Sequence, residues 1–284
     1  MISRTIAASA ALLLAACAHE ARVEYPAIGD KGHLVLIGGG AKPDDVIQLF
    51  VDLAGGPNAD IVVLPLASED SRQAGADYID LFRAHGAGRV TVVQIDDRRD
   101  ALRAEYASVV GKATAVFFSG GDQSRIASRI VDTPILDAVR AVKARGGVVG
   151  GTSAGTACES EVMLTGAGDD EELAPHNMVL ARGIGLFEGV IVDSHFVARR
   201  RFTRLQSVVL EHPQLLGIGV DEATAAWVKP DGTMEVRGRS AVIVYDASRA
   251  AISVRSGKFV ASGMSTYSLT ARQGFNLRTR QVIP

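Results

Sequence analysis

One stretch of the chain restricts the fold more than any other. An apolar run over residues 147–150 leads directly into the small residues Gly151-Thr152-Ser153-Ala154-Gly155. Small residues allow a strand to turn sharply into a helix, and such a turn exposes a serine hydroxyl beside the free N–H groups of the helix. The pattern therefore predicts an α/β fold with a nucleophile at Ser153. A glycine-rich turn without chemistry, or one that holds an anion, would have the same pattern.

Strand-like and helix-like segments alternate up to this serine. We expect strands near residues 33–38, 60–66, 89–95, 113–118 and 147–151, and helices near 43–53, 71–84, 100–110 and 134–143. This alternation is typical of a doubly wound, mainly parallel sheet flanked by helices. Past residue 222, short strands near 224–228, 233–236 and 241–245 predict a C-terminal antiparallel extension on the same core. Since no linker separates the two parts, residues 31–284 are expected to form a single domain.

Two further strand ends offer a base and a carboxylate. His195 closes an apolar run over residues 189–192, and Glu222 follows another run over 216–220. Ligands of open α/β sheets bind at the carboxyl ends of strands, so Ser153, His195 and Glu222 are expected to meet at that edge. They would act as nucleophile, base and orienting carboxylate. Each residue also has a more ordinary interpretation when it is considered alone. A histidine at a strand end, such as His195, is more often structural, and an acidic pair after a strand, such as the one that contains Glu222, is usually a cap or a solvated turn.

Several blocks of sequence carry a resemblance to a known family. They are residues 34–40, 61–68, 118–123, 151–155 and 193–196, the last followed by Arg199, Arg201 and Arg204. In these blocks the chain resembles the cyanophycinase and aspartyl dipeptidase family of serine exopeptidases, and is most similar to the cyanophycinase branch. The resemblance implies a class I glutamine amidotransferase-like fold and the triad Ser153, His195 and Glu222. Ser194 departs from that branch, which usually has glutamine there, and this leaves the exact substrate open.

The resemblance also implies an activity. The expected enzyme is a serine-type exopeptidase that hydrolyses cyanophycin, or related β-aspartyl-arginine peptides, to β-Asp-Arg dipeptides. Cyanophycin is a polyaspartate backbone with arginine joined to each side-chain carboxyl, so its binding site must accept carboxylates and guanidinium groups together. One alternative is an aspartyl dipeptidase-like enzyme that acts on other acidic peptides. The other is a non-catalytic periplasmic peptide-binding lipoprotein.

Three arginines are candidates for binding the aspartyl carboxylates of such a substrate. Arginine suits this task because its planar fork grips a carboxylate with two hydrogen bonds and stays charged. We expect Arg199, Arg201 and Arg204 to bind substrate, with the last two on one helix face. A solvated basic helix face is the alternative. The acidic run over 169–172 offers a counter-charge for guanidinium groups, although a solvated loop is its more ordinary interpretation.

Further contacts with the substrate are expected from the resemblance. Gln123, predicted on a loop after a strand, and Asp193 would contact the substrate. The backbone amides of Gly121 and Ala154 would form the oxyanion hole. A plain tight turn capped by Asp122 is the competing interpretation of the segment around Gln123.

The N-terminus has the pattern of a bacterial lipoprotein signal. Arg4 supplies a positive charge, residues 6–14 form a short apolar region, and Leu14-Ala15-Ala16-Cys17 resembles a lipobox. We expect residues 1–16 to be removed, Cys17 to be lipidated, and residues 17–30 to tether the domain to a membrane. The protein would then be a periplasmic or cell-surface lipoprotein. A plain secretory signal that is cut nearby is the alternative.

Composition and missing motifs narrow the possible partners. With 284 residues, of which 47% are hydrophobic and 22% charged, the chain can bury a full core. A net charge of −2 without a basic tail argues against nucleic acid. No metal or cofactor is expected, because the sequence has no metal-binding or phosphate-loop motif.

The run Gly38-Gly39-Gly40 is interpreted as a tight turn, and Cys158 as a core residue. Relatives in this family often dimerise, so the resemblance makes a homodimer one option and leaves the oligomeric state open.

Overall fold

The structure is a computed structural model that describes residues 31–168 and 171–283. The predicted signal and tether, residues 1–30, lie outside the described residues, and so do Asp169 and Asp170 of the acidic run. Within the described ranges, no helix has both the length and the apolar composition that crossing a membrane requires.

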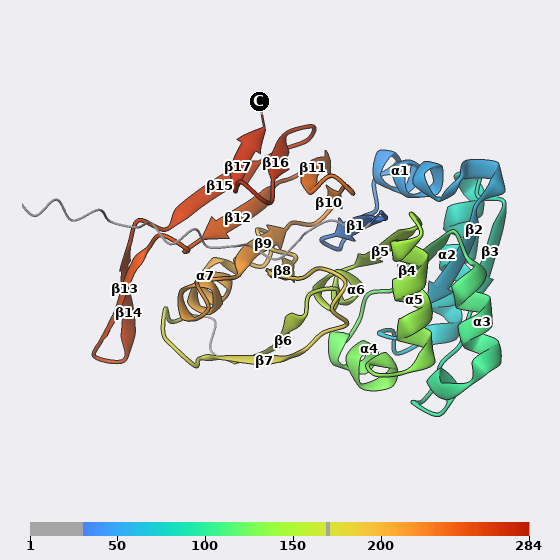
Figure 1. The fold of residues 1–284 in the computed structure, drawn as a ribbon, viewed down its shortest axis with the longest axis horizontal. Helices are drawn as coiled ribbons and strands as arrows, with labels where there is room; N and C mark the ends of the chain where they lie inside the picture. Colours follow the sequence, from blue (N-terminus) through green and yellow to red (C-terminus); the bar gives the residue numbers. More distant parts are fainter. Residues whose placement is uncertain (1–30, 169–170, 284) are drawn as a thin grey trace, which may run out of the picture.

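A nine-stranded sheet runs through the larger part of the molecule (Figure 1). Its parallel strands, in spatial order, are β1 (His33–Ile37), β5 (Val148–Thr152), β4 (Ala115–Phe118), β2 (Asp60–Leu64) and β3 (Arg89–Val92). The predicted parallel strands are thus confirmed, with shorter ends for the third and fourth. Every residue of β4 and β5 is buried, as expected for central strands covered on both faces.

Antiparallel strands continue this sheet beyond β1. They are β10 (Thr224–Val228), β11 (Thr233–Gly238), β16 (Gly274–Asn276) and β17 (Gln281–Ile283). β10 pairs directly with β1, so that Leu34 lies opposite Val228. The chain therefore returns to the edge of the parallel sheet after Glu222 and extends it.

A second, four-stranded sheet corrects one expectation from the sequence. It has the order β15 (Ser265–Leu269), β12 (Val242–Asp246), β9 (Leu216–Val220) and β8 (Val190–Ser194). The strands that precede His195 and Glu222 are parallel neighbours here and do not belong to the main sheet. Burial and length alone could not distinguish the two sheets, because strands of either sheet have apolar runs of the same kind.

Helices cover both faces of the parallel strands, as double winding requires. α1 (Asp44–Ala54) and α2 (Ser71–Ala84) pack Phe50 and Phe82 against Phe117 on one face. The opposite face is covered by α3 (Ala104–Lys112), α4 (Gln123–Ile130) and α5 (Pro134–Ala144). Short 3₁₀ turns, η1 (Gly56–Asn58) and η2 (Asp100–Leu102), precede β2 and α3, so the helix predicted near 100–110 is split.

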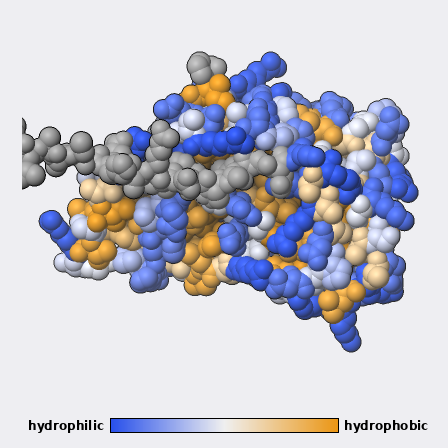
Figure 2. Space-filling view, in the orientation of Figure 1, coloured by the Kyte–Doolittle hydropathy of each residue, from blue (hydrophilic) through white to orange (hydrophobic). Residues whose placement is uncertain are grey.

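The remaining elements surround the second sheet. They are α6 (Ala154–Ala157), β6 (Val162–Gly168), β7 (Met178–Arg182), α7 (Phe202–Glu211), β13 (Ala251–Arg255) and β14 (Lys258–Ser262). α7 packs Leu205 and Val209 against this sheet. The β13–β14 hairpin forms the left end of the molecule, and Figure 2 shows apolar residues gathered there, with Val254 51% and Val260 47% exposed. Cys158 is buried, as expected.

Candidate active site

Ser153 lies on the turn between β5 and α6. Its backbone has φ 54° and ψ −110°, a conformation that non-glycine residues rarely adopt and that occurs at functional turns. The amide N–H of Ser153 donates a hydrogen bond to the carbonyl of Ile37 at 2.9 Å, which fixes the turn against β1. The serine side chain is only partly buried, so its hydroxyl is accessible from the adjoining pocket.

Steric constraints require glycine at two positions close to the serine. A Cβ atom on Gly151 would lie 2.4 Å from the carbonyl carbon of Gly155, and one on Gly155 would lie 2.4 Å from the carbonyl oxygen of Phe118. Both clashes are with backbone atoms, which a side-chain rotation cannot relieve. The small residues of the pentad therefore reflect the close passage of α6 over the ends of β4 and β5.

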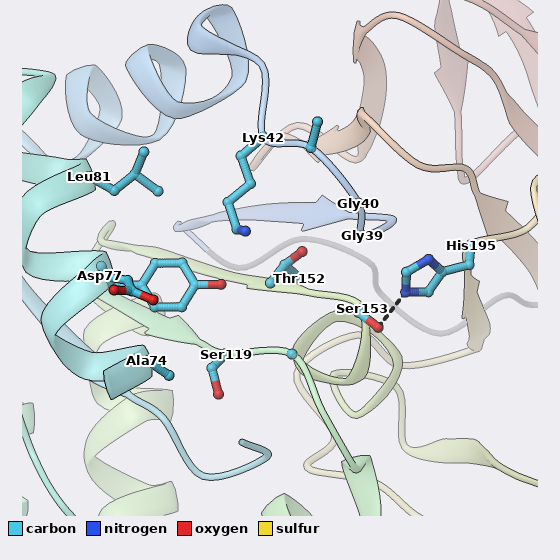
Figure 3. A pocket seen from close by; sticks show the side chains of 13 residues that line it. Gly39, Gly40, Lys42, Ala74, Asp77, Leu81, Ser119, Thr152, Ser153 and His195 are labelled. Atoms are coloured by element: carbon cyan, nitrogen blue, oxygen red, sulfur yellow. Dashed lines mark hydrogen bonds between the residues drawn. The ribbon is translucent and has the colours of Figure 1, made fainter. Parts of the chain in front are cut away.

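His195 and Glu222 form a line of hydrogen bonds with Ser153. The distance from Ser153 Oγ to His195 Nε2 is 2.7 Å, and that from His195 Nδ1 to Glu222 Oε1 is 2.6 Å. Figure 3 shows the first of these contacts as a dashed line. The histidine side chain is 9% exposed and that of the glutamate is 40% exposed. In such an arrangement an imidazole can take the hydroxyl proton while the carboxylate stabilises the resulting imidazolium.

The end of β1 connects the three segments that carry these side chains. The successive carbonyls of residues 37–39 accept hydrogen bonds from the amides of Ser153, His195 and Ala223, at 2.9, 2.7 and 3.0 Å in that order. Ala223 directly follows Glu222. Because β5 belongs to the main sheet and β8 and β9 to the second, these hydrogen bonds cross the junction between the two sheets.

Gly39 and Gly40 make room for the histidine and the glutamate. A Cβ atom on Gly39 would lie 2.3 Å from the His195 ring, and one on Gly40 would lie 2.8 Å from Glu222 Oε2. Both glycines also have positive φ angles, 105° and 65°. The glycine run after β1 is thus a turn, as expected, and it is also shaped around the side chains that face Ser153.

The environment of His195 favours its neutral form. Burial is the main cause that lowers the pKa of His195 below its ordinary value of 6.5. The hydrogen bond with Glu222 opposes this, and the positive charges of Arg199 and Arg201 lower the pKa further. A neutral imidazole, which can accept a proton, is therefore the main form near pH 7.

Asp221, the neighbour of Glu222, fixes the loop after the histidine. Its carboxylate accepts hydrogen bonds from the amides of Val197 and Ala198, at 3.0 and 2.9 Å, and from Ser240 Oγ at 2.6 Å. Burial raises the pKa of Asp221, but these hydrogen bonds outweigh it and lower the pKa overall. The two carboxylates after β9 therefore differ in role, because Glu222 faces the histidine and Asp221 faces the backbone.

A pocket of about 640 Å³ opens beside Ser153 (Figure 3). Its walls are the loop 39–42 after β1, one face of α2, and the ends of β4 and β5. Lys42 and Asp77 are the charged side chains among its lining residues, and His195 lines it as well. The volume is that of a site for a small molecule or a short peptide. Within the described part of the chain, no group of three or more His, Cys, Asp and Glu side chains is placed to hold a metal ion.

Asp193 and Arg204, which were expected to contact substrate, bind each other. Arg204 Nε and Nη2 donate to the two carboxylate oxygens of Asp193 at 2.6 and 2.5 Å. The side chains are 1% and 4% exposed, and neither lines the pocket beside Ser153. Arg204 therefore binds a carboxylate of the protein itself and not the aspartyl group of a substrate, as had been expected. The pair connects α7 to β8.

Arg199 and Arg201 lie on the turn that follows His195. Arg199 is exposed, whereas Arg201 is partly buried and donates to the carbonyl of Ser194 at 2.7 Å. α7 begins at Phe202, so Arg201 precedes the helix and does not share a helix face as predicted. Of the three candidate arginines, Arg199 is the one with an exposed side chain next to the histidine.

Gln123 is the first residue of α4, where a loop was expected. Its side-chain amide donates to the carbonyl of Leu164 at 2.8 Å, which connects α4 to β6. The carboxylate of Asp122 accepts from the amide of Ser124 at 2.8 Å and caps the helix. Gln123 does not line the pocket in this structure.

The two predicted oxyanion-hole residues lie on turns near the serine. Ala154 follows Ser153 and is the first residue of α6. Gly121 has φ 138°, and a Cβ atom there would lie 2.0 Å from the carbonyl oxygen of Ala67, so only glycine fits. Its neighbour Gly120 lines the pocket, where an added Cβ would lie 3.4 Å from Ser153 Cβ.

Lys42 and Asp77 are charged pocket residues that sequence reasoning missed. Lys42 lies two positions after the glycine run that follows β1, on the carboxyl side of a parallel strand. That is the edge where ligands bind in open α/β sheets, so its position was a usable signal.

Comparison with known proteins is consistent with this geometry. The model of the family described as "Peptidase family S51" matches residues 34–236, a range that contains Ser153, His195 and Glu222. A cyanophycinase from Synechococcus elongatus is 36% identical over 265 residues, which cover 89% of this chain and 82% of that protein. A cyanophycinase from Geminocystis herdmanii is 37% identical over 217 residues, which cover 75% of this chain and 80% of that protein.

Solved structures support the fold. A peptidase from an acI-B1 Actinobacterium superposes with a TM-score of 0.66 at 22% identity, covering 86% of this chain and 96% of its own. A putative peptidase E from Listeria monocytogenes superposes with a TM-score of 0.51 at 14% identity, covering 74% of this chain and 99% of its own. Both are consistent with a mixed α/β fold that has a central, mostly parallel sheet. With the family match spanning both the sheet and the Ser-His-Glu line, the chain belongs to peptidase family S51 and is a peptidase.

Proposed function

We propose that this peptidase is a serine exopeptidase that hydrolyses cyanophycin, or related β-aspartyl-arginine peptides, to β-Asp-Arg dipeptides. The hydrogen-bonded line from Ser153 through His195 to Glu222, which borders a peptide-sized pocket, is the observation that carries the proposal. The cyanophycinases among the similar proteins supply the substrate class.

In the proposed reaction, Ser153 Oγ attacks the scissile carbonyl carbon while His195 Nε2 takes the hydroxyl proton. The tetrahedral intermediate then expels the amine, which receives that proton from His195, and an ester remains on Ser153. Water attacks the ester with His195 again as base, and the acid product leaves with Ser153 restored. Glu222 holds the histidine tautomer and stabilises the imidazolium in both steps.

The oxyanion of each intermediate would be held by backbone amides. We assign this role to Ala154, whose amide begins α6, and to Gly121 on the turn after β4. Preformed donors of this kind typically contribute about 2.7–4 kcal/mol each to transition-state stabilisation.

The arginines would divide between contact with substrate and support of the site. Arg199 is exposed beside His195, so we assign it to a carboxylate of the substrate. Arg201 and Arg204 would act by shaping the turn, through Ser194 and Asp193. Gln123 would act as support as well, since its amide is bound to the backbone of β6.

The parallel sheet with its two helical layers would correspond to a class I glutamine amidotransferase-like core. We propose that residues 31–284 form a single domain in which the antiparallel strands are a C-terminal extension. The direct pairing of β10 with β1 supports this assignment, because the extension continues the sheet without a break.

Mass spectrometry of the reaction products tests the proposed activity. The domain, begun after Pro26, should release β-Asp-Arg from insoluble cyanophycin, and Ser153→Ala should release none while its thermal unfolding is unchanged. Release by Ser153→Ala would overturn the nucleophile assignment. Cleavage of aspartyl dipeptides but not of the polymer would favour the aspartyl dipeptidase alternative, and peptide binding without any cleavage would favour a binding lipoprotein.

We propose a lipid anchor on the basis of the N-terminal sequence pattern. Residues 1–16 would be removed, and the lipidated Cys17 would hold the protein at a periplasmic or cell-surface membrane. The full chain expressed in a bacterial host should then fractionate with membranes, and Cys17→Ser should not. A soluble wild-type chain would contradict the anchor.

A homodimer is proposed as well, and light scattering of the soluble domain would measure its molar mass.

A further inference from the structure

The pocket beside Ser153 has one positive and one negative side chain on the side away from His195. Figure 3 shows Lys42 and Asp77 on one side of the serine and the histidine on the other. Lys42 comes from the loop after β1, whereas Asp77 comes from α2. The proposed mechanism does not use either charge.

Lys42 is a pocket cation that no carboxylate of the described residues holds in an ion pair. Its ammonium nitrogen lies 5.4 Å from the centre of the Tyr78 ring, and among the described residues it forms no ion pair. Burial lowers the pKa of Lys42 below its ordinary value, and the more distant charge of Asp77 opposes this. A partly desolvated cation gains most from an anion that enters its pocket, because a charge-assisted hydrogen bond then replaces lost hydration.

Asp77 belongs to the face of α2 that lines the pocket. This face consists of Ala74, Asp77, Tyr78 and Leu81, whose spacing of three and four residues places them on one side of the helix. Asp77 is exposed, and its Oδ1 accepts a hydrogen bond from Gln73 at 2.8 Å. The pocket thus offers a carboxylate, an apolar and aromatic wall, and a cation.

This combination fits one arginine that is linked through its α-amino group. Such an arginine presents a free α-carboxylate and a guanidinium, separated by an aliphatic stem. We propose that the pocket binds one arginine moiety of the substrate, with Lys42 on its carboxylate and Asp77 on its guanidinium. The assignment rests on the proposed function, since β-aspartyl-linked arginine is the substrate that presents both groups. Substrate recognition is then divided between this pocket and Arg199, which follows His195 and does not line the pocket.

Synthetic oligomers separate the two charges. We would compare short β-Asp-Arg oligomers with two modified forms, one with the arginine carboxylates amidated and one with citrulline in place of arginine. Citrulline keeps the shape of arginine but has no charge. Calorimetry with Ser153→Ala measures binding without turnover, and mass spectrometry with Ser153 intact measures cleavage.

Each substitution should weaken binding only of oligomers that carry the charge which the substituted residue is proposed to bind. In the Ser153→Ala background, Lys42→Met should weaken binding of the unmodified oligomer about tenfold to hundredfold. It should leave binding of the amidated oligomer within about a factor of two, the error expected for independent sites. Asp77→Asn should show the same contrast between the unmodified and the citrulline oligomers.

Matched controls remove the same charges elsewhere. Lys112→Met on α3 and Asp80→Asn on α2 alter exposed residues outside the pocket and should not change the affinity of any oligomer. The modified oligomers also probe the pocket of the unsubstituted Ser153→Ala chain, where each should bind more weakly than the unmodified form. The test therefore does not depend on the folding of a pocket variant.

The outcomes distinguish the pocket assignment from the proposed function. Equal losses on modified and unmodified oligomers would overturn the arginine pocket, because charge would not be what is recognised. Charge-selective binding without cleavage of any oligomer by the intact chain would retain the pocket and reject the proposed function. Cleavage combined with charge-independent binding would retain the function and reject the pocket.

Discussion

Asp193 and Arg204 are joined by two hydrogen bonds in a buried position between β8 and α7. His195 lies two residues after Asp193, so this pair holds the strand end that presents the histidine to Ser153. The carboxylate that Arg204 binds is thus supplied by the protein itself.

Loss of Arg204 should therefore reduce stability. Arg204→Met removes the bidentate partner of the buried Asp193 carboxylate and leaves Arg201 Nη1 at 3.4 Å from Asp193 Oδ1. Removing one member of a buried pair typically costs about 3–5 kcal/mol, and the remaining contact with Arg201 places the expected loss at the lower end of that range. Urea unfolding followed by circular dichroism measures the change. Arg199→Met is the matched control, and as an exposed substitution it should change the unfolding free energy by no more than about 0.5 kcal/mol. Unchanged stability of Arg204→Met with weaker substrate binding would instead make Arg204 a substrate contact.

The turn after β1 should tolerate no side chain at Gly39. An added Cβ would lie 2.3 Å from the His195 ring, and a displacement of the base of this kind should lower kcat by about a hundredfold. Gly39→Ala and Gly56→Ala form a matched pair, because both glycines have positive φ but an added Cβ on Gly56 meets nothing within 4 Å. Gly56→Ala should lose some stability and keep its activity. Equal kcat values for the two variants would contradict the role given to Gly39.

The pH profile should report the charges around His195. Since burial, Arg199 and Arg201 lower the pKa of His195, the acidic limb of kcat/KM should lie below pH 6.5. Arg199→Gln removes one of the positive charges that lower the pKa of His195, so it should move this limb to higher pH, most clearly at low salt. High salt should reduce the difference between the two profiles. A shift to lower pH would have the wrong sign for this explanation.

Glu159, which follows α6 and Cys158, should make stability fall as pH rises. Its carboxyl oxygens are buried and have no hydrogen-bond partner among the described residues, and burial raises the pKa of Glu159 well above its ordinary value. The folded state therefore keeps the proton that the unfolded state releases near pH 4.5, so stability declines above that pH. Glu159→Gln should be more stable than wild type at pH 8 and closer to it at pH 5, since only wild type must keep a proton or bury a charge at the higher pH.

Unfolding at the two pH values, by urea and circular dichroism, measures this effect. Glu188→Gln, at an exposed site, is the control and should follow wild type at both pH values. A stability difference between Glu159→Gln and wild type that is the same at pH 5 and pH 8 would show that the carboxyl group does not titrate in this range.

The sequence predicted those features that depend on local pattern. The parallel strands and the sharp turn at Ser153 follow from apolar runs and small residues, and His195 and Glu222 do lie at strand ends within hydrogen-bonding distance of one another. The membership of β8 and β9 in a second sheet could not be predicted, because pairing partners are chosen by tertiary packing. The same limit applies to Arg204, since a sequence shows an arginine but not which carboxylate it binds.

The three carbonyls at the end of β1 have a consequence for heat tolerance. They accept hydrogen bonds from the segments of Ser153, His195 and Glu222, so the alignment of the site depends on a few backbone contacts at the junction of two sheets. Local opening of such a junction requires less free energy than unfolding of either core. Activity should therefore disappear reversibly some degrees below the melting temperature. The end of one strand then sets the temperature range in which the enzyme works. The stability of the whole fold sets only the higher temperature beyond which activity no longer recovers on cooling.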